Sequence, residues 1–263
     1  MPQNPMIALD NVSMAFGDNV VVEEVSLEVK VHELLCIVGT SGGGKTTLLR
    51  AMDGLIPPYR GRILLEGEEV TRPSPSVAMI FQHFGLFPWK TVRANVEYGL
   101  SVRGRRDEHG IVDRLLEVMH LTDNAEHYPY QLSGGMQQRV GLARALAVEP
   151  KVLLMDEPFS AVDALTRESL QTELLSLWDR EEKMTAILVT HDIDEAILLG
   201  DRIAVLYGRP GRLALELEVP IERPRSPEEI RFHPEYAQLR KQVWEALQGE
   251  QRRSTYEEGR FRT

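Results

Sequence analysis

The chain has 263 residues, of which 43% are apolar, and a formal net charge of −10. This length and apolar content support one large domain with a subdomain, whereas the acidic balance argues against nucleic acid as the main partner, since phosphate backbones need a basic face. No apolar run exceeds five residues, and residues 1–6 lack the pattern of a secretory signal, so we expect a soluble chain without a membrane span.

Apolar periodicity and turn residues predict the elements in chain order. Strands are predicted over Ile7–Phe16, Val20–Val29, Leu34–Val38, Arg62–Leu65, Val77–Phe81, Val152–Met155, Thr185–Thr190 and Ile203–Tyr207. Helices are predicted over Lys45–Met52, Val92–Met119, Gly134–Val148, Thr166–Glu182 and Asp192–Leu199. Strands that alternate with helices indicate an α/β fold with a largely parallel sheet.

Two stretches depart from this alternation and define the organisation. From about residue 91 to 148 helix follows helix, which indicates an inserted helical subdomain. Residues 219–227 carry three prolines and are typical of an extended linker. A helix with an apolar stripe at Tyr236, Leu239, Val243 and Leu247 should then pack back on the body, followed by a charged tail. We therefore expect a main domain over 1–218 and a C-terminal linker, helix and tail over 219–263.

The run Gly39–Thr46 matches the Walker A pattern G-x-x-x-x-G-K-[ST] between a predicted strand and a predicted helix. Its glycines let backbone N–H groups turn toward a phosphate, Lys45 brings a cation to the β and γ phosphates, and the Thr46 hydroxyl can ligate Mg²⁺. The alternative is a flexible glycine-rich turn, which the strand and helix on either side disfavour. Nucleotide binding is thus assigned to Gly39, Thr40, Ser41, Gly42, Gly43, Gly44, Lys45, Thr46 and Thr47.

The run Lys151–Glu157 has the form of a Walker B segment, in which a buried strand ends in two carboxylates. Ligands bind at the carboxyl ends of strands in α/β sheets, so Asp156 is a candidate for Mg²⁺ through water. Glu157 is a candidate for polarising the attacking water. An acidic pair after a strand is common, and the Walker A upstream is what favours function here.

The run Leu132–Arg139 places Ser133, Gly134 and Gly135 at the start of a predicted helix. The plain interpretation is an ordinary serine N-cap with glycines. The functional interpretation is a second anion site, which would bind the γ-phosphate held by another copy of the chain. A two-fold dimer would satisfy both sites reciprocally.

With these motifs in order, the chain resembles the ATP-binding cassette proteins over about residues 7–208. Ser133–Met136, followed by Gln-Gln-Arg, resembles the signature of that family, and Ser160–Asp163 resembles its D-loop. Gln82 matches the Q-loop glutamine, and His191 the switch histidine. Phe16 stands where the family has its adenine-stacking aromatic, commonly tyrosine, and Val162 replaces the commoner leucine of the D-loop.

The resemblance implies a P-loop NTPase core of the RecA type with a mostly parallel sheet, an N-terminal antiparallel β-subdomain and the helical insertion. It implies ATP and Mg²⁺ as ligands and ATP hydrolysis as the activity. Glu157, His191 and Gln82 would be catalytic, and Thr46, Gln82 and Asp156 would hold the metal. Phe16, Ser133, Gly134, Gly135 and Asp163 would join the Walker A residues in binding nucleotide.

The loop Phe81–Trp89 is unusually aromatic and indicates a protein interface, or alternatively packing beneath the helical subdomain. Its Leu86–Trp89 stretch, with Pro210-Gly211-Arg212 and Arg223-Pro224-Arg225, is similar to importer cassettes for nitrate, sulfonate, taurine and related solutes. That similarity implies a second copy, an integral membrane permease and a solute-binding protein as partners, no nucleic acid, and a peripheral location on the cytoplasmic face of the membrane.

Two other functions stay open at this point. A soluble ABC-type ATPase of repair or translation would usually have paired cassettes, long coiled coils or cysteine-rich zinc modules, whereas this chain has one cassette and one cysteine. A regulatory nucleotide-binding module without turnover would lack Glu157 or His191, and both are present.

Several other residues receive a structural interpretation. Cys36 is taken as a small core residue, and a lone cysteine without an internal disulfide fits a reducing cytosol. Asp192 and Glu195 are spaced like a helix cap and its reciprocal acid. Five histidines show no metal-ligand spacing and are taken as surface or structural residues: His83, His109, His120, His127 and His233.

Overall fold

The computed structural model describes residues 4–82, 85–107, 109–160, 162–180 and 184–248. The chain divides into two compact units, of which the first comprises Met1–Pro73 with Ile187–Thr263, and the second Ser74–Ala186. No helix within the described ranges has both the length and the apolarity to cross a membrane.

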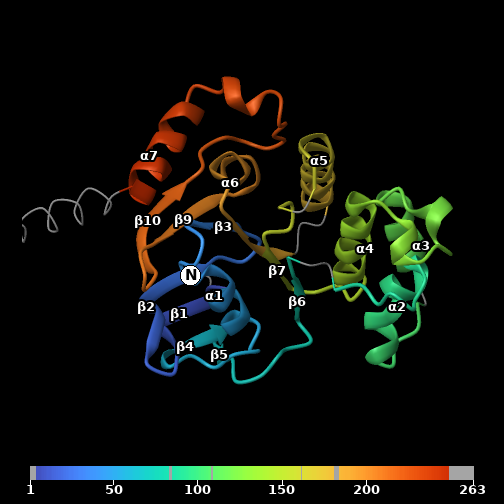
Figure 1. Ribbon diagram of the computed structural model, residues 1–263, viewed down its shortest axis with the longest axis horizontal. Coiled ribbons are helices and arrows are strands. Elements are labelled where there is room, and N and C mark those ends of the chain that lie inside the picture. The colour runs from blue at the N-terminus through green and yellow to red at the C-terminus, as the bar shows by residue number, and fades with distance from the viewer. Residues whose placement is uncertain (1–3, 83–84, 108, 161, 181–183, 249–263) are drawn as a thin grey trace, which may run out of the picture. The chain divides into compact units, whose positions relative to one another are not determined.

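The first unit contains an antiparallel sheet with the strand order β2-β1-β4-β5 (Figure 1). Its strands are β1 (Ile7–Phe16), β2 (Asn19–Val29), β4 (Arg60–Leu65) and β5 (Glu68–Glu69). Ile7 lies opposite Val29 of β2 on one side and Leu65 of β4 on the other. The expected N-terminal antiparallel β-subdomain is therefore confirmed.

The same unit holds a second group of strands beside the helix that follows the Walker A run. Strand β3 (Leu34–Gly39) pairs in parallel with β9 (Arg202–Tyr207), and β9 pairs antiparallel with β10 (Arg212–Glu218). All six residues of β3 are buried, as expected for a strand covered on both faces, and α6 (Ile193–Leu199) packs on it. Helix α1 (Lys45–Met52) also contacts β3, and α7 (Tyr236–Gln248) contacts β9 and β10.

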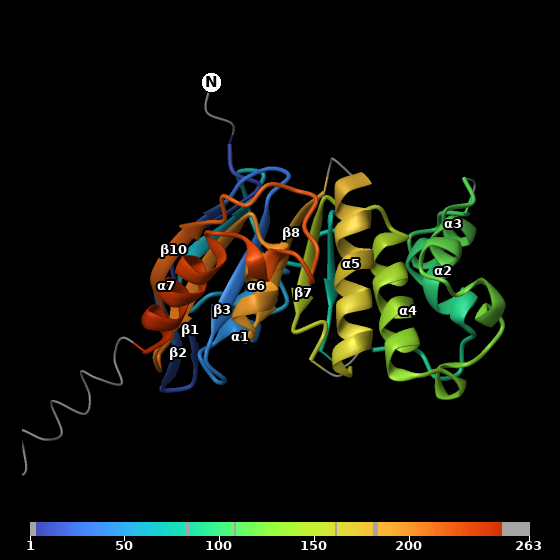
Figure 2. The same cartoon turned by 90° about the horizontal axis from the view of Figure 1, so that it is seen from above.

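The second unit is built from parallel strands and helices. Strand β6 (Val77–Ile80) pairs with β7 (Val152–Asp156), and β8 (Thr185–Thr190) begins in this unit and ends in the first. Its helices are α2 (Val92–Val102), α3 (Ile111–Val118), α4 (Gly134–Leu146) and α5 (Ala164–Arg180), with single turns of 3₁₀-helix at Thr122–Asn124 and Pro129–Gln131. Helices α4 and α5 run side by side (Figure 2).

Three expectations about elements need correction. The single helical stretch Val92–Met119 is two helices, because Gly104 and Gly110 adopt left-handed conformations with φ of 65° and 63° between them. Strand β10 was not expected, although its exposed and half-buried residues alternate strictly. Helix α5 begins two residues before the predicted Thr166, and the predicted last residue, Glu182, lies outside the described residues.

The C-terminal segment belongs to the first unit and contains a 3₁₀ turn, Ile230–Phe232, before α7. Tyr236, Leu239 and Val243 are buried on α7, as the apolar stripe predicted, whereas Leu247, the last residue of that stripe, is half-buried. The division into a domain over 1–218 and a C-terminal part over 219–263 stays a prediction. The charged tail from residue 249 lies outside the described residues.

Candidate functional site

The Walker A lysine is held in place by the loop that precedes it. Lys45 is the first residue of α1, and only 5% of it is exposed. Its Nζ donates hydrogen bonds to the carbonyl oxygens of Gly39 at 2.9 Å and Thr40 at 3.1 Å. The ammonium is therefore directed into the loop, where a phosphate bound by the backbone N–H groups would meet it.

The glycines of this loop satisfy both conformational and steric demands. Gly42 and Gly44 have φ of +80° and +82°, which side chains adopt only with strain. A Cβ on Gly44 would also collide with Val22 of β2, and one on Gly39 with the carbonyl oxygen of Leu206 on β9. The loop is thus shaped by neighbours that the motif itself does not contain.

A second loop, between β9 and β10, supports the Walker A loop from outside. The guanidinium of Arg209 donates to the carbonyl oxygen of Ser41 at 2.7 Å. Gly211 lies so close to Gly43 that a Cβ would collide with the Gly43 carbonyl, and its N–H donates to Val21 of β2 at 2.9 Å. Sequence reasoning missed this support, because the residues lie far apart in the chain and belong to no shared motif.

His191, expected as the switch histidine, is exposed and lies between the end of β8 and the start of α6. Asp192 is the N-cap of α6, since its Oδ1 accepts from Asp194 N at 2.9 Å and from Glu195 N at 3.2 Å. Asp192 N donates to the hydroxyl of Thr190, which in turn donates to the buried carboxylate of Glu195. The predicted N-cap at Asp192 is confirmed. Glu195, the expected reciprocal acid, is connected to Asp192 indirectly, through the Thr190 hydroxyl.

Phe16 is the last residue of β1, at the tip of the β1–β2 hairpin, and is 52% exposed. Its neighbour across the hairpin is Asn19. An aromatic ring exposed at a loop tip contributes little to a core and offers its face to a planar ligand. This placement is compatible with the expected stacking role.

In the second unit the two Walker B carboxylates are placed differently. Asp156 ends the buried strand β7 and is 3% exposed, whereas Glu157 is half-buried and has φ of +46°, in the left-handed region. The Glu157 carbonyl accepts from the N–H of Ser160 at 3.2 Å and from its hydroxyl at 2.9 Å. A non-glycine residue held with positive φ is uncommon and is often found at functional sites.

The signature segment starts α4 with a genuine cap. The Ser133 hydroxyl accepts from Met136 N at 3.3 Å, and Ser133 and Gly134 are exposed. Gly135 is buried against Thr166 of α5, where a Cβ would collide with the Thr166 methyl group. The two signature glycines therefore differ, because the first is accessible and the second permits close packing of α4 on α5.

The D-loop aspartate caps α5. Asp163 accepts from Thr166 N at 3.1 Å and from the Thr166 hydroxyl at 2.7 Å, and these two bonds hold the pKa of its carboxyl below the usual range. Asp163 is thus fixed by the same residue that packs on Gly135. The adjacent D-loop residue Ala161 lies outside the described residues.

Two residues of the Gln-Gln-Arg run tie the signature helix to its surroundings. The buried Gln138 amide donates to the carbonyl oxygen of Pro158, the residue after Glu157. Arg139 makes a two-point ion pair with Glu173 of α5, at 2.6 and 2.9 Å. The signature helix is thereby connected to the Walker B loop and to α5, a role that the motif alone did not indicate.

In the aromatic loop after β6, some side chains pack on neighbouring residues and others are exposed. Gln82 is exposed, and His83 and Phe84 lie outside the described residues. The Phe87 ring packs on Tyr98 with centroids 4.4 Å apart, and the Arg144 guanidinium lies 5.5 Å from its centroid. Phe87 thus follows the packing alternative.

A buried asparagine fixes the shape of this loop. Asn95 accepts from Phe87 N at 2.8 Å, and its amide donates to the carbonyls of Phe87, Lys90 and Thr91 at 3.2, 3.0 and 2.9 Å. Trp89, which lies between Phe87 and Lys90 in this loop, is nevertheless 71% exposed. The Trp89 ring lies with its centroid 5.7 Å from that of Phe87 and still exposes most of its surface, which is typical of an aromatic residue at an interface.

Comparison with known proteins decides the family. The model of the family described as ABC transporter matches residues 22–160, which is more than half of the chain. The chain belongs to the ABC transporter family. It is therefore an ATP-binding cassette with ATP hydrolase activity.

Individual relatives cover nearly the whole cassette. The taurine import ATP-binding protein TauB of Roseobacter denitrificans is 44% identical, over 90% of this chain and 92% of its own. The nitrate import ATP-binding protein NrtD of Synechococcus elongatus is 42% identical, over 88% and 86%. The dimeric post-hydrolysis structure of the cassette MJ0796, bound to ADP and Pi, superposes with a TM-score of 0.72 at 31% identity, over 82% of this chain and 100% of its own.

The expected cassette residues divide between the two units. The first contains Phe16, the Walker A residues Gly39 to Thr47, and His191. The second contains Gln82, Ser133, Gly134, Gly135, Asp156, Glu157 and Asp163. Within each unit, the structure assigns supporting roles that sequence reasoning missed to Arg209, Gly211, Asn95, Gln138 and Thr166.

Electrostatics at the far end of the Walker A helix give a testable prediction. Asp53 is the C-cap of α1, and burial raises the pKa of its carboxyl from 3.8 to about 6. The folded state therefore keeps this proton up to a higher pH than the unfolded state does, so stability falls as the pH rises from about 4 to about 6. A negative charge at a helix C-terminus also opposes the helix dipole.

We expect Asp53→Asn to raise the free energy of unfolding by about 1–2 kcal/mol at pH 7.5, and by about half as much at pH 5. Urea unfolding at the two pH values measures this. Asp18→Asn, at an exposed carboxylate in the β1–β2 turn, is the matched control and should give no such gain. A gain at Asp53 that is the same at both pH values would contradict the electrostatic cause.

Proposed function

We propose that this cassette is the ATP-hydrolysing subunit of an importer, which dimerises head to tail around two ATP molecules and drives a separate permease. The observation that carries the proposal is that one chain has two helices whose N-termini are opened by glycines. Helix α1 follows the loop that holds Lys45, and α4 follows the exposed Ser133 and Gly134. Such N-termini favour anions, and two of them on one chain suit a shared phosphate between two chains.

In this proposal the nucleotide is bound mainly by the first unit. Phe16 stacks on adenine, and the backbone N–H groups of Gly39–Thr47 surround the phosphates, with Lys45 neutralising the β and γ charges. The support is the exposed ring of Phe16 and the buried, loop-directed ammonium of Lys45. The same preorganised charge would stabilise the γ-phosphoryl group during transfer.

Hydrolysis is assigned to Glu157, with Gln82 and His191 as further catalytic residues. The Glu157 carboxylate orients a water and accepts its proton while the water oxygen bonds to the γ-phosphorus. The bond from that phosphorus to the bridging oxygen breaks, and the electron pair leaves with ADP. The positive φ of Glu157 and the two bonds to its carbonyl support a fixed placement of the backbone that carries this side chain.

The donor set fits Mg²⁺, a hard cation that prefers oxygen ligands and keeps several waters. We propose that Thr46, Gln82 and Asp156 hold it with their hydroxyl, amide and carboxylate oxygens. The buried position of Asp156 at the end of β7 supports this, because a buried carboxylate is most stable with a cation. When bound, Mg²⁺ neutralises charge on the phosphates.

The second copy would supply Ser133, Gly134, Gly135 and Asp163 to the nucleotide held by the first. The exposed start of α4 leaves Ser133 and Gly134 accessible for this purpose. The packing of Gly135 on Thr166 and the cap formed by Asp163 would keep the signature and D-loop in one rigid surface. The dimeric state of MJ0796 with ADP and Pi supports the arrangement.

Transport is the finer part of the proposal. The relatives named for taurine and nitrate import support nitrate, sulfonate or taurine-like solutes. The permease would bind the aromatic loop through Trp89, and a solute-binding protein would complete the importer. The cassette would then lie at the cytoplasmic face of the membrane as a peripheral subunit.

The first test concerns the catalytic carboxylate. We expect Glu157→Gln to lower ATP turnover by about two orders of magnitude or more, the usual scale for loss of a general base. ATP binding should persist, because the amide keeps the shape and hydrogen bonds of the carboxylate. Turnover at saturating ATP and binding of a fluorescent ATP analogue measure the two effects. Wild-type turnover would contradict the role of Glu157.

The second test concerns the dimer and uses two chains with one cysteine each. Thr40→Cys in one chain and Gly134→Cys in the other are exposed positions, whereas Gly135 has no room for a Cβ. Both chains carry Glu157→Gln, and Cys36→Ala removes the native cysteine, which is fully buried. The two chains are made different in length so that a mixed dimer can be recognised. A crosslink between them should form with ATP and be lost without it.

Because each chain has one cysteine, no crosslink within a chain can be mistaken for the dimer. Each chain incubated alone is the control for crosslinks between identical positions. Equal crosslinking with and without ATP, or none with ATP, would contradict the head-to-tail dimer.

The third test separates coupling from chemistry. We expect Trp89→Ser to lower the fraction of the chain recovered with membranes by about tenfold, because exposed aromatic anchors often contribute 2 kcal/mol or more to an interface. Turnover by the isolated chain should stay within about twofold. Phe232→Ser, at an 87% exposed aromatic in the C-terminal segment, is the control and should change neither. Membrane recovery unaffected by Trp89→Ser would contradict its role, and no recovery of the wild type would favour a soluble ATPase.

A further inference from the structure

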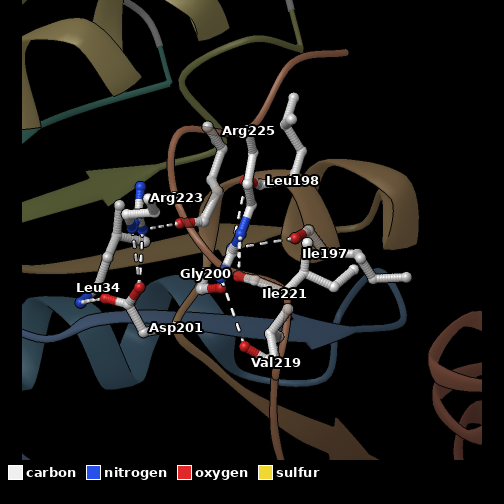
Figure 3. Close-up of polar contacts among 10 residues, drawn as sticks. Leu34, Ile197, Leu198, Gly200, Asp201, Val219, Ile221, Arg223 and Arg225 are labelled. Atoms are coloured by element: carbon white, nitrogen blue, oxygen red, sulfur yellow. Dashed lines mark hydrogen bonds and ion pairs between the residues drawn. The ribbon is translucent and has the colours of Figure 1, made fainter. Parts of the chain in front are cut away.

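The C-terminal segment holds helix α6 at both ends. Two of its arginines, Arg223 and Arg225, reach the C-terminal end of α6, and two residues of α7 reach the N-terminal end (Figure 3 shows Arg223 and Arg225). Helix α6 has seven residues, about two turns, and helices this short depend on tertiary contacts for their stability. Besides its packing on β3, the contacts at its two ends therefore help to fix its position.

At the C-terminal end, Arg225 satisfies the last carbonyls of the helix. Arg225 is only 8% exposed, and its Nη1 donates to carbonyl oxygens of Ile197, Leu198 and Gly200 at 3.2, 3.3 and 2.6 Å. Its other nitrogens donate to carbonyls of its own segment, Ile221 at 2.8 Å and Val219 at 3.4 Å. A cation here complements the free carbonyls and the negative end of the helix dipole.

Arg223 extends this contact toward the strand that leads into the Walker A loop. Its Nη2 donates to the Leu199 carbonyl at 2.6 Å, and its guanidinium also binds Asp201 Oδ1 at 2.9 and 3.0 Å. The other carboxylate oxygen of Asp201 accepts from Leu34 N, at the start of β3, at 2.8 Å. The end of α6 is thus fixed relative to β3.

At the N-terminal end, α7 binds a residue in the first turn of α6. Arg240 donates from Nε to Asp194 Oδ1 at 2.8 Å. Burial, and after it a hydrogen bond to Asp194, raise the pKa of Tyr236 to about 12. Asp194 in turn donates its backbone N–H to the cap residue Asp192, which directly follows His191. A continuous path therefore joins α7 to His191.

We propose that Arg240 and Tyr236 are positioning residues for ATP hydrolysis, which act through Asp194 and the Asp192 cap to place His191. The inference rests on the proposed function, because it requires His191 to take part in catalysis. It assigns a role to the C-terminal segment, which lies beyond the residues matched by the family model. Loss of the contact would let the first turn of α6 shift while the Walker A loop stays in place.

The main test changes Arg240, which is exposed, so that folding is preserved. We expect Arg240→Met to lower kcat about tenfold with the KM for ATP unchanged, since small displacements of a catalytic group are costly. Tm should change by less than about 4 °C, because exposed ion pairs contribute little to stability. Arg240→Lys should restore much of kcat, and Tyr236→Phe should lower it less than Arg240→Met.

A neighbouring ion pair on the same helix supplies the matched control. Lys241 pairs with Glu245 at 3.8 Å, and both side chains are more exposed than those of Arg240 and Asp194. Lys241→Met should leave kcat unchanged. An equal loss in both variants would show a general effect of α7 and overturn the proposal.

A double-mutant cycle with His191→Ala decides whether the effect passes through His191. In the His191→Ala background, Arg240→Met should cause no further loss of kcat. The same tenfold loss in both backgrounds would overturn the positioning role while leaving the proposed function intact. Wild-type kcat for His191→Ala alone would instead overturn the role of His191 in the proposed function, and the inference with it.

Discussion

The first unit of this cassette depends on the Walker A loop, whose carbonyls accept hydrogen bonds from the lysine that ends the loop. The Lys45 ammonium can bond the Gly39 and Thr40 carbonyls only if the backbone between them turns through left-handed conformations at Gly42 and Gly44. That geometry leaves no space for side chains and lets β2 and β9 approach the loop closely. The antiparallel subdomain and the Arg209 loop therefore help to shape the Walker A loop although they carry no part of the motif.

The signature half follows the same principle with different residues. The absence of a side chain at Gly135 lets α4 pack on Thr166, and Thr166 holds the D-loop aspartate through its N–H and hydroxyl. Gln138 connects the same helix to the backbone just after Glu157. A displacement of α4 would consequently move the D-loop and the Walker B loop together. A site shared between two copies would need this coupling.

The structure also shows why some features could be predicted from the sequence and others could not. The Walker and signature motifs are local, since each needs particular residue types at fixed spacing, and the strands and helices around them alternate regularly. Strand β10, Arg212–Glu218, carried a visible period of two, but it was overlooked because it lacks the continuous apolar run of the core strands and none of its residues is buried. The break between α2 and α3 was signalled by Gly104 and Gly110, which a continuous helical pattern outweighed.

Contacts between distant residues had no such signal. Arg223 and Arg225 bind backbone carbonyls more than 20 residues away, and a backbone carbonyl has no residue type to recognise in a sequence. The aromatic loop illustrates the same limit, because spacing alone could not separate the packed Phe87 from the exposed Trp89. What separates them is Asn95, whose four bonds set the direction of the loop.

In the sequence, a structural and a functional interpretation of the same residue were treated as alternatives. In the structure the two interpretations are compatible for several residues. Ser133 and Asp163 are ordinary helix caps, and each lies exposed at the start of a helix where a phosphate or a partner chain would meet it. Asp192 is likewise a cap, and through it the exposed His191 is attached to α6. A cap fixes its own side chain and the first turn behind it, so it is a physically sound base for a catalytic or binding group. Ser133, Asp163 and Asp192 are held in this way at the starts of α4, α5 and α6, and the C-terminal segment contacts α6, the helix that the Asp192 cap begins.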